Sequence, residues 1–188
     1  AIDINKFISA LTSDDYAVQA KVMEETVKLA QLAPNVAVDL LDVKVIDTLL
    51  NIVNVNTEGI QGPSPRQLEI RDRIMRGQSV TEAELAEANQ ITPRELAEKN
   101  KQYSIYTIAA LGKLYAAEVK EMNGEMPPIN ELPGMSDIVE QIKNNENPMV
   151  KIAGIKAMNY VKAPEYKEDI SAVYSIAMAD NEYTTLMS

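Results

Sequence analysis

Residues 145–161 read NENPMVKIAGIKAMNYV, and this stretch decides how we interpret the rest of the chain. Asn147 and Pro148 predict a helix start, because asparagine caps helices and proline fits the first helical position. The apolar stripe that follows contains Gly154, although a glycine in a helix interior costs about 1 kcal/mol relative to alanine. We therefore expect a neighbouring helix to pack close to Gly154, so that leucine is excluded there and alanine is tolerated.

A second helix carries a similar apolar pattern earlier in the chain. The stretch SIYTIAALGKLYA, residues 104–116, aligns with residues 148–160 at an offset of 44 residues. The matched pairs are Ile108 with Ile152, Ala109 with Ala153, Ala110 with Gly154, Leu111 with Ile155, and Leu114 with Met158. A period of this length is typical of repeated helical hairpins, each of which buries its apolar face against its neighbours.

The start of the later helix also shows a distinctive order of residue types. Asn147 is followed by residues that fit the order proline, any residue, valine, basic residue and small residues: Pro148, Val150, Lys151, Ala153, Gly154, Ala157 and Met158. This region resembles a HEAT or armadillo repeat, in which Asn147 stands in an acidic position. The resemblance is good over about 136–180, loose over 104–120 and 14–53, and absent over 57–101. It implies a short solenoid of stacked helical hairpins; an irregular α-helical bundle is the alternative, because any close helix crossing favours small residues.

Helix start and stop signals divide the chain further. Ser13 precedes a helix over 14–33, and residues 36–53 divide near Asp42 into a short helix and a longer one. We therefore expect a single all-α domain that begins with a helical unit over 1–56 and ends with repeat-like helices over 102–182.

Residues 57–101 are predicted to be an irregular insertion of short capped helices. Three helix starts are marked there, by Ser64 with Pro65, by Thr81 with Glu84, and by Thr92 with Pro93 and Glu95. Gly77 ends the first of these helices. A long apolar helix is expected to begin only at about Gln102 and to end at Asn123.

Composition restricts the possible chemistry. The 188 residues include no cysteine and no histidine, which removes thiolate nucleophiles, the commonest metal ligand and the usual general base at neutral pH. A net charge of -10 opposes general attraction to nucleic acids, and no apolar run is long enough to insert into a membrane. We therefore predict no enzyme, no catalytic residue, no cofactor and no metal; a carboxylate-dependent enzyme is the less favoured alternative.

Two groups of side chains are candidates for contact with a partner. Arg66, Arg73 and Arg76 share one face of a predicted helix, where they could receive an acidic partner or a phosphate. The alternative is a solvated face, neutralised by pairs of Glu69 with Arg73 and Asp72 with Arg76. The second group consists of tyrosines, whose rigid rings suit peptide-binding grooves but also cover core edges: Tyr103, Tyr106 and Tyr166.

These features favour a noncatalytic scaffold that binds a protein or peptide on a helical-repeat surface. The alternative is a structural or assembly subunit that oligomerises through exposed helix faces. The chain starts at Ala1 without a visible signal peptide, so both a cytoplasmic and an exported location stay open, as do the oligomeric state and the identity of the partner.

Overall fold

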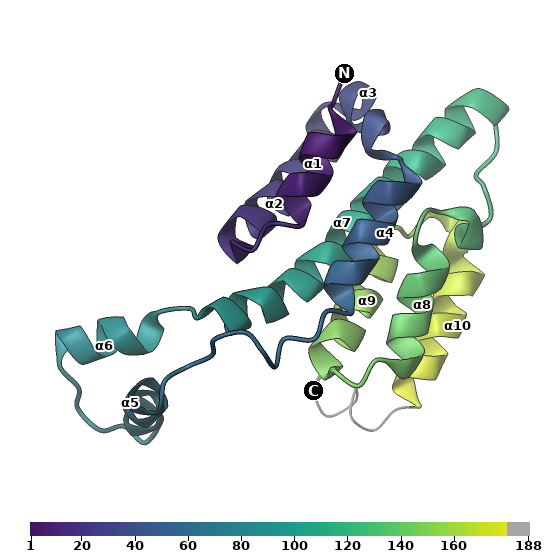
Figure 1. Ribbon diagram of the computed structural model, residues 1–188. Helices are drawn as coiled ribbons and strands as arrows, with labels where there is room; N and C mark the ends of the chain where they lie inside the picture. Colours follow the sequence, from purple (N-terminus) through teal and green to yellow (C-terminus); the bar gives the residue numbers. More distant parts are fainter. Residues whose placement is uncertain (180–188) are drawn as a thin grey trace. The chain divides into compact units, whose positions relative to one another are not determined.

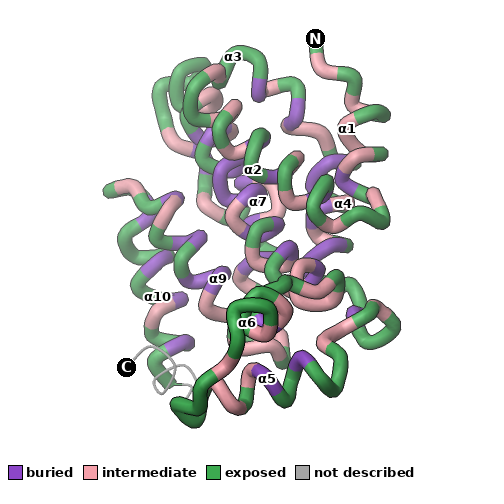
Figure 2. The backbone as a smooth tube through the Cα atoms, turned by 90° about the vertical axis from the view of Figure 1, so that its left-hand side faces the viewer, coloured by how far each residue is buried: buried purple, intermediate pink, exposed green. Residues whose placement is uncertain are grey.

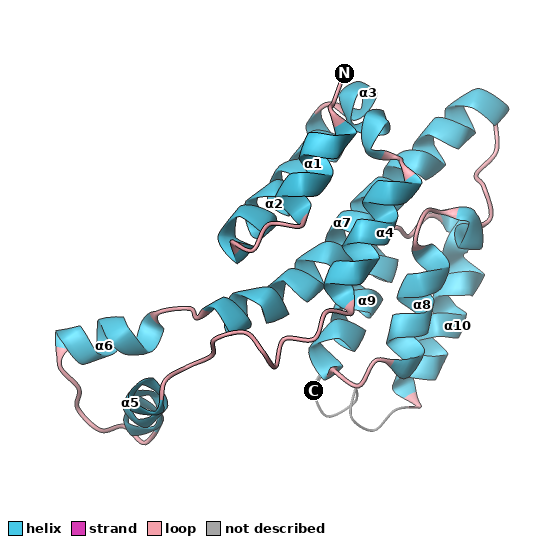
Figure 3. Cartoon of the chain, in the orientation of Figure 1, coloured by secondary structure: helices cyan, strands magenta, loops and turns pink. Residues whose placement is uncertain are grey.

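A computed structural model describes residues 1–179, which form helices joined by loops and turns (Figure 3). It contains ten α-helices and three short 3-10 helices, and no strand occurs within the described residues. The predicted all-α class is thus confirmed. Two compact units form within the described residues: a large one, residues 1–55 together with 100–179, and a small one, residues 56–99 (Figure 1).

The N-terminal part of the large unit confirms the division of residues 36–53 near Asp42. Asp42 is the N-cap of the longer helix and accepts a hydrogen bond from the backbone N–H of Lys44 at 2.8 Å. The first helix was missed, although Asp3 caps it in the same way. The elements are α1 (Ile4–Leu11), α2 (Tyr16–Leu32), α3 (Pro34–Ala37), η1 (Val38–Leu40) and α4 (Val43–Val53).

Helix α7 (Pro93–Asn123) corrects the expected break near Gln102, because the structure shows one continuous helix of 31 residues. No glycine or proline occurs between residues 94 and 111, so nothing in the local sequence ends the helix that Pro93 begins. The rise in apolar content near residue 102 therefore reflects the surroundings of the helix. Its end at Asn123 is as predicted.

Buried polar side chains of α7 connect it to the N-terminal helices of the large unit. Asn100 donates from Nδ2 to the carbonyl of Tyr16 and to Oε1 of Gln19, both at 2.9 Å. Ser104 donates to the carbonyl of Leu49 on α4 at 2.5 Å. Since Asn100 and Ser104 are fully buried, these bonds satisfy the Asn100 Nδ2 and the Ser104 hydroxyl, which have no access to water, whereas Oδ1 of Asn100 is buried without a hydrogen-bond partner. Figure 2 shows the buried residues of α7, α4 and α9 as purple segments.

The C-terminal part of the large unit is built from three packed helices. Helix α8 contacts α9, and α10 contacts both. The side chains of Ile170, Val173 and Ala177 on the last helix are buried, together with Tyr166 in the turn before it. The elements are η2 (Ile129–Glu131), α8 (Met135–Asn144), α9 (Pro148–Tyr160), η3 (Pro164–Tyr166) and α10 (Lys167–Met178).

Gly154 lies at a close crossing of α9 with α8, as expected. A Cβ atom at this position would lie 2.5 Å from Cγ1 of Ile142 and 3.7 Å from Cγ2 of Ile138. The first distance is far below van der Waals contact, and Cγ1 is attached to a stiff β-branched carbon. Alanine therefore does not fit unless the Ile142 side chain or α8 itself moves, which corrects the expectation that it would be tolerated.

The small unit contains α5 (Pro65–Met75) and α6 (Glu82–Asn89), followed by the first residues of α7. Its helix ends are formed by the predicted side chains. The Ser64 hydroxyl accepts a hydrogen bond from Gln67 N–H at 3.0 Å, and Thr81 with Glu84 makes both bonds of a capping box.

Candidate functional site

The arginine face of α5 is neutralised within the small unit. Each of its three arginines has a carboxylate partner: Arg66 pairs with Glu87 at 3.1 Å, Arg76 with Asp72 at 2.7 Å, and Arg73 with Glu84. The pair of Arg76 with Asp72 is one of the two pairs that i, i+4 spacing predicts. Arg73 bonds across to α6, however, and not to Glu69 on its own helix. Long-range packing thus replaces one of the two expected local pairs.

Arg71, which the sequence places off this face, makes the densest set of contacts in the unit. Its guanidinium forms two hydrogen bonds to the Glu95 carboxylate, at 2.8 and 3.1 Å. It also donates to the carbonyls of Ala88 and Gln90, at 2.8 and 3.0 Å. These bonds from Arg71, with further bonds from Thr92, lower the pKa of Glu95 to about 2. Arg71 therefore stabilises the fold of the small unit.

Glu84 is the second carboxyl group whose pKa is lowered to about 2. The largest cause is the hydrogen bond from the backbone N–H of Thr81, followed by the bond from Arg73. The same carboxylate therefore caps α6 and neutralises α5.

The three candidate tyrosines differ in exposure. Tyr103 is 41% exposed on α7, whereas Tyr106 is half-buried, and burial raises its pKa. Tyr166 is 2% exposed, and its hydroxyl donates to the carbonyl of Pro127 at 2.6 Å, so it cannot be reached by a partner in this structure. This corrects its assignment as a surface contact. The three tyrosines lie in the large unit and the three arginines in the small one.

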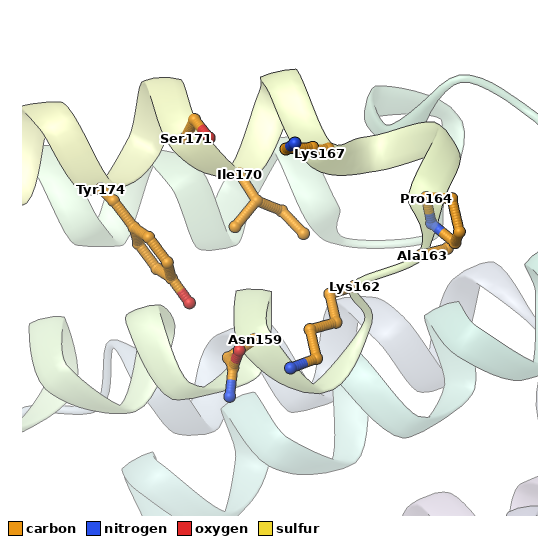
Figure 4. Close-up of a pocket in the computed structure, with 8 residues that line it drawn as sticks. All are labelled: Asn159, Lys162, Ala163, Pro164, Lys167, Ile170, Ser171 and Tyr174. Carbon is orange, nitrogen blue, oxygen red and sulfur yellow. The ribbon is translucent and has the colours of Figure 1, made fainter.

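A groove between α9 and α10, which we call the α9–α10 groove, was not predicted (Figure 4). One part has a volume of about 450 Å³ and continues into a second part of about 420 Å³; Asn159 and Tyr174 line both. The remaining lining residues come from the two helices and the turn between them: Ile155, Lys156, Lys162, Ala163, Pro164, Lys167, Ile170, Ser171, Ala177 and Met178.

The local sequence explains how the groove opens. Helix α9 ends at Tyr160, and Pro164 begins the 3-10 turn that leads into α10. Lys167, Ser171 and Tyr174 recur at i, i+4 and i+7 and therefore form one row beside the buried face of α10. Figure 4 shows Tyr174 and Ile170 pointing from α10 toward α9. Tyr174 in this row is the sequence feature that could have located the groove, but Tyr166 was the tyrosine predicted to contact a partner.

The groove is basic in a chain that is acidic. Among the described residues that line it there is no carboxylate, whereas Lys156, Lys162 and Lys167 are all present. None of these three lysines forms an ion pair with any residue of the range 1–179. The groove therefore offers cationic groups beside an apolar floor.

Two further features of the described residues bear on metal binding and on membrane insertion. Within residues 1–179 no three His, Cys, Asp or Glu side chains gather in a way that could hold a metal ion. No helix in that range combines the length and apolar character that crossing a membrane requires. The chain matches no protein-family model, no curated protein and no solved structure.

Proposed function

We propose that this protein is a noncatalytic scaffold that binds a protein or peptide in the α9–α10 groove, on repeat-like stacked helices. The observation that carries the proposal is the open, apolar-floored groove with Tyr174 at its centre. Tyrosine is enriched in binding surfaces because its ring contributes contact area and its hydroxyl a hydrogen bond. Ile170, Ala177 and Met178 supply the apolar surface beside it.

The packing of α8, α9 and α10 supports the repeat-like part of the proposal. Gly154 allows α8 and α9 to approach closely, and Ala110 is buried on α7 at the corresponding position. Stacked helical units expose extended grooves in this way, and such surfaces bind partners.

Selection of random peptides against the full chain tests the proposed function. Ser171→Trp places a large ring in the groove, whereas Ala172→Trp makes the same change at the next, exposed position of α10, which does not line it. We expect selected peptides to bind the wild type and Ala172→Trp equally, and to bind Ser171→Trp at least about tenfold more weakly. Equal binding to both variants, or no enrichment at all, would refute the groove as the binding site.

The alternative of an assembly subunit is favoured by one observation in the small unit. Leu68 and Met75, at i and i+7 on α5, are 53% and 88% exposed. If these side chains mediate assembly, light scattering will show a mass that rises with protein concentration. The rise will then be abolished by Leu68→Ser with Met75→Ser.

A further inference from the structure

We propose that the occupant of the α9–α10 groove is an acidic segment of a partner protein. Its carboxylates pair with Lys156, Lys162 and Lys167, and an apolar side chain packs on Tyr174. This inference rests on the proposed function and adds the chemistry of the bound segment.

Charge complementarity is the first argument. The chain has 28 acidic and 18 basic residues, yet no described lining residue of this groove is acidic. Two other cavities of the large unit differ in this respect: one is lined by Asp42, Asp47 and Asp137, and the other by Glu125, Glu165 and Asp169. The three groove lysines are thus a local reversal of the overall charge, and they attract an anionic group.

Unused polar groups are the second argument. The side chains of Asn159, Ser171 and Tyr174 line the groove, and none has a hydrogen-bond partner among residues 1–179. An amide and two hydroxyl groups can bond to the main chain of a bound peptide. Since the lysine ammonium groups can take its carboxylates, the groove provides partners for both kinds of polar group.

The length of the groove fits a short segment. The row from Lys167 to Met178 extends about 16 Å, at about 1.5 Å of rise per helical residue. An extended peptide of about five residues covers this distance. Three lysines along such a segment suit two or three acidic side chains that alternate with apolar ones.

A protein segment fits better than a polyanion. The net charge of -10 repels nucleic acids and anionic lipid surfaces over longer distances. Three lysines on a narrow groove attract only a few charges, and the apolar floor has no counterpart on a phosphate backbone. The groove thus favours a segment with mixed acidic and apolar side chains.

Peptides selected against the full chain provide the test. We expect most of them to contain two or more acidic residues with at least one apolar residue. Their affinity, measured by fluorescence anisotropy, should fall as salt is raised from about 50 to 500 mM, because ion pairs at an open groove are screened. Lys156→Gln with Lys162→Gln and Lys167→Gln should weaken binding by about tenfold or more.

A second triple variant controls for net charge. Lys6, Lys44 and Lys143 are exposed lysines on α1, α4 and α8, and they lie outside the groove. Changing these three to glutamine removes the same total charge and should alter the affinity by less than about twofold. Equal weakening by both triple variants would overturn the proposed contacts.

The remaining outcomes separate this inference from the proposed function. Neutral selected peptides that still fail to bind Ser171→Trp would refute the acidic segment and leave peptide binding intact. Binding of duplex DNA or phosphatidylserine vesicles that is as tight and as sensitive to the groove lysines would identify a polyanion and overturn the inference. Self-association that the groove triple variant abolishes would identify a second copy of the chain, with the same consequence.

Discussion

The two units of this protein are stabilised by different interactions. In the large unit, side chains such as Leu49, Ile108 and Leu111 are fully buried in a continuous apolar core. In the small unit, the buried apolar side chains are Ile70, Ala88 and Ala97. Hydrogen bonds and ion pairs of guanidinium, carboxylate and amide groups supplement these few apolar side chains.

Gln67 shows how the small unit compensates for its limited apolar surface. Its side-chain amide is buried and donates to the carbonyls of Glu87 and Gln90, at 3.0 and 2.9 Å. Together with Arg71, it satisfies backbone groups at the end of α6 that would otherwise need water. We therefore expect the stability of the large unit to respond mainly to changes in side-chain volume, and that of the small unit to changes in charge and hydrogen bonding.

The largest expected effect is on the stability of the large unit. Gly154→Leu forces a side chain into Ile142 and should lower the free energy of unfolding by about 3 kcal/mol. Urea denaturation, followed by the circular dichroism of the helices, measures the change. Gly112→Ala is the control, because its new Cβ would lie 3.6 Å from Cβ of Leu132, an ordinary contact. Loss of stability in both variants would show that glycine itself, and not the crossing with α8, is required.

The next effect should be confined to the small unit. Arg71→Met removes two hydrogen bonds to the Glu95 carboxylate and the bonds to the carbonyls of Ala88 and Gln90, which should cost about 2 kcal/mol. Hydrogen exchange should then speed up in α5 and α6 while the amides of α8 stay protected. Arg76→Met, which removes an exposed pair with Asp72, should cost less than about 0.5 kcal/mol. Equal acceleration across both units would contradict the difference between them.

A smaller effect tests a single hydrogen bond within the apolar unit. Tyr166→Phe removes the bond to Pro127 but keeps the buried ring, so we expect a loss of about 1 kcal/mol. Tyr103→Phe is the control on an exposed ring and should leave the thermal midpoint unchanged. A similar shift for both variants would show that the Pro127 contact contributes nothing specific.

The smallest expected effect is a loss of stability at low pH, because solvent partly screens the carboxylates of Glu84 and Glu95. The pKa values of Glu84 and Glu95 are lowered from 4.5 to about 2, so the folded small unit favours their charged forms. The stability that they contribute is complete above pH 4.5 and is lost as the pH falls through about 2. Carboxyl carbon shifts in NMR, followed together with hydrogen exchange in α5 and α6, measure this. If both groups titrate near 4.5, the pairs with Arg73 and Arg71 do not persist in solution.

Local chemistry explains which features could be predicted. Capping is decided within four residues, so the helix starts after Asp42, Ser64 and Thr81 could be located from the sequence. The start of α1 carries the same signal at Asp3, although no helix was predicted there. A change of apolar content near Gln102 does not end a helix, because the surroundings of α7 differ along its length while its backbone continues.

The candidate site was harder to predict because it depends on contacts between distant residues. Arg73 had a suitable acid on its own helix, yet it pairs with Glu84 on another. Tyr166 and Tyr174 are eight residues apart, yet Tyr166 is 2% exposed, whereas Tyr174 is half-buried and lines the α9–α10 groove. Which ring is buried depends on the position of the Pro127 loop, and helical periodicity does not contain that information.

The contact between Gly154 and Ile142 has an evolutionary consequence. Because the Cβ of any other residue at position 154 would collide with Ile142, a smaller side chain at 142 lowers the cost of a substitution there. In related chains these two positions should therefore vary together, with bulk on one side exchanged for bulk on the other. That linked variation gives distant relatives of this protein a recognisable signature even after the rest of the sequence has diverged.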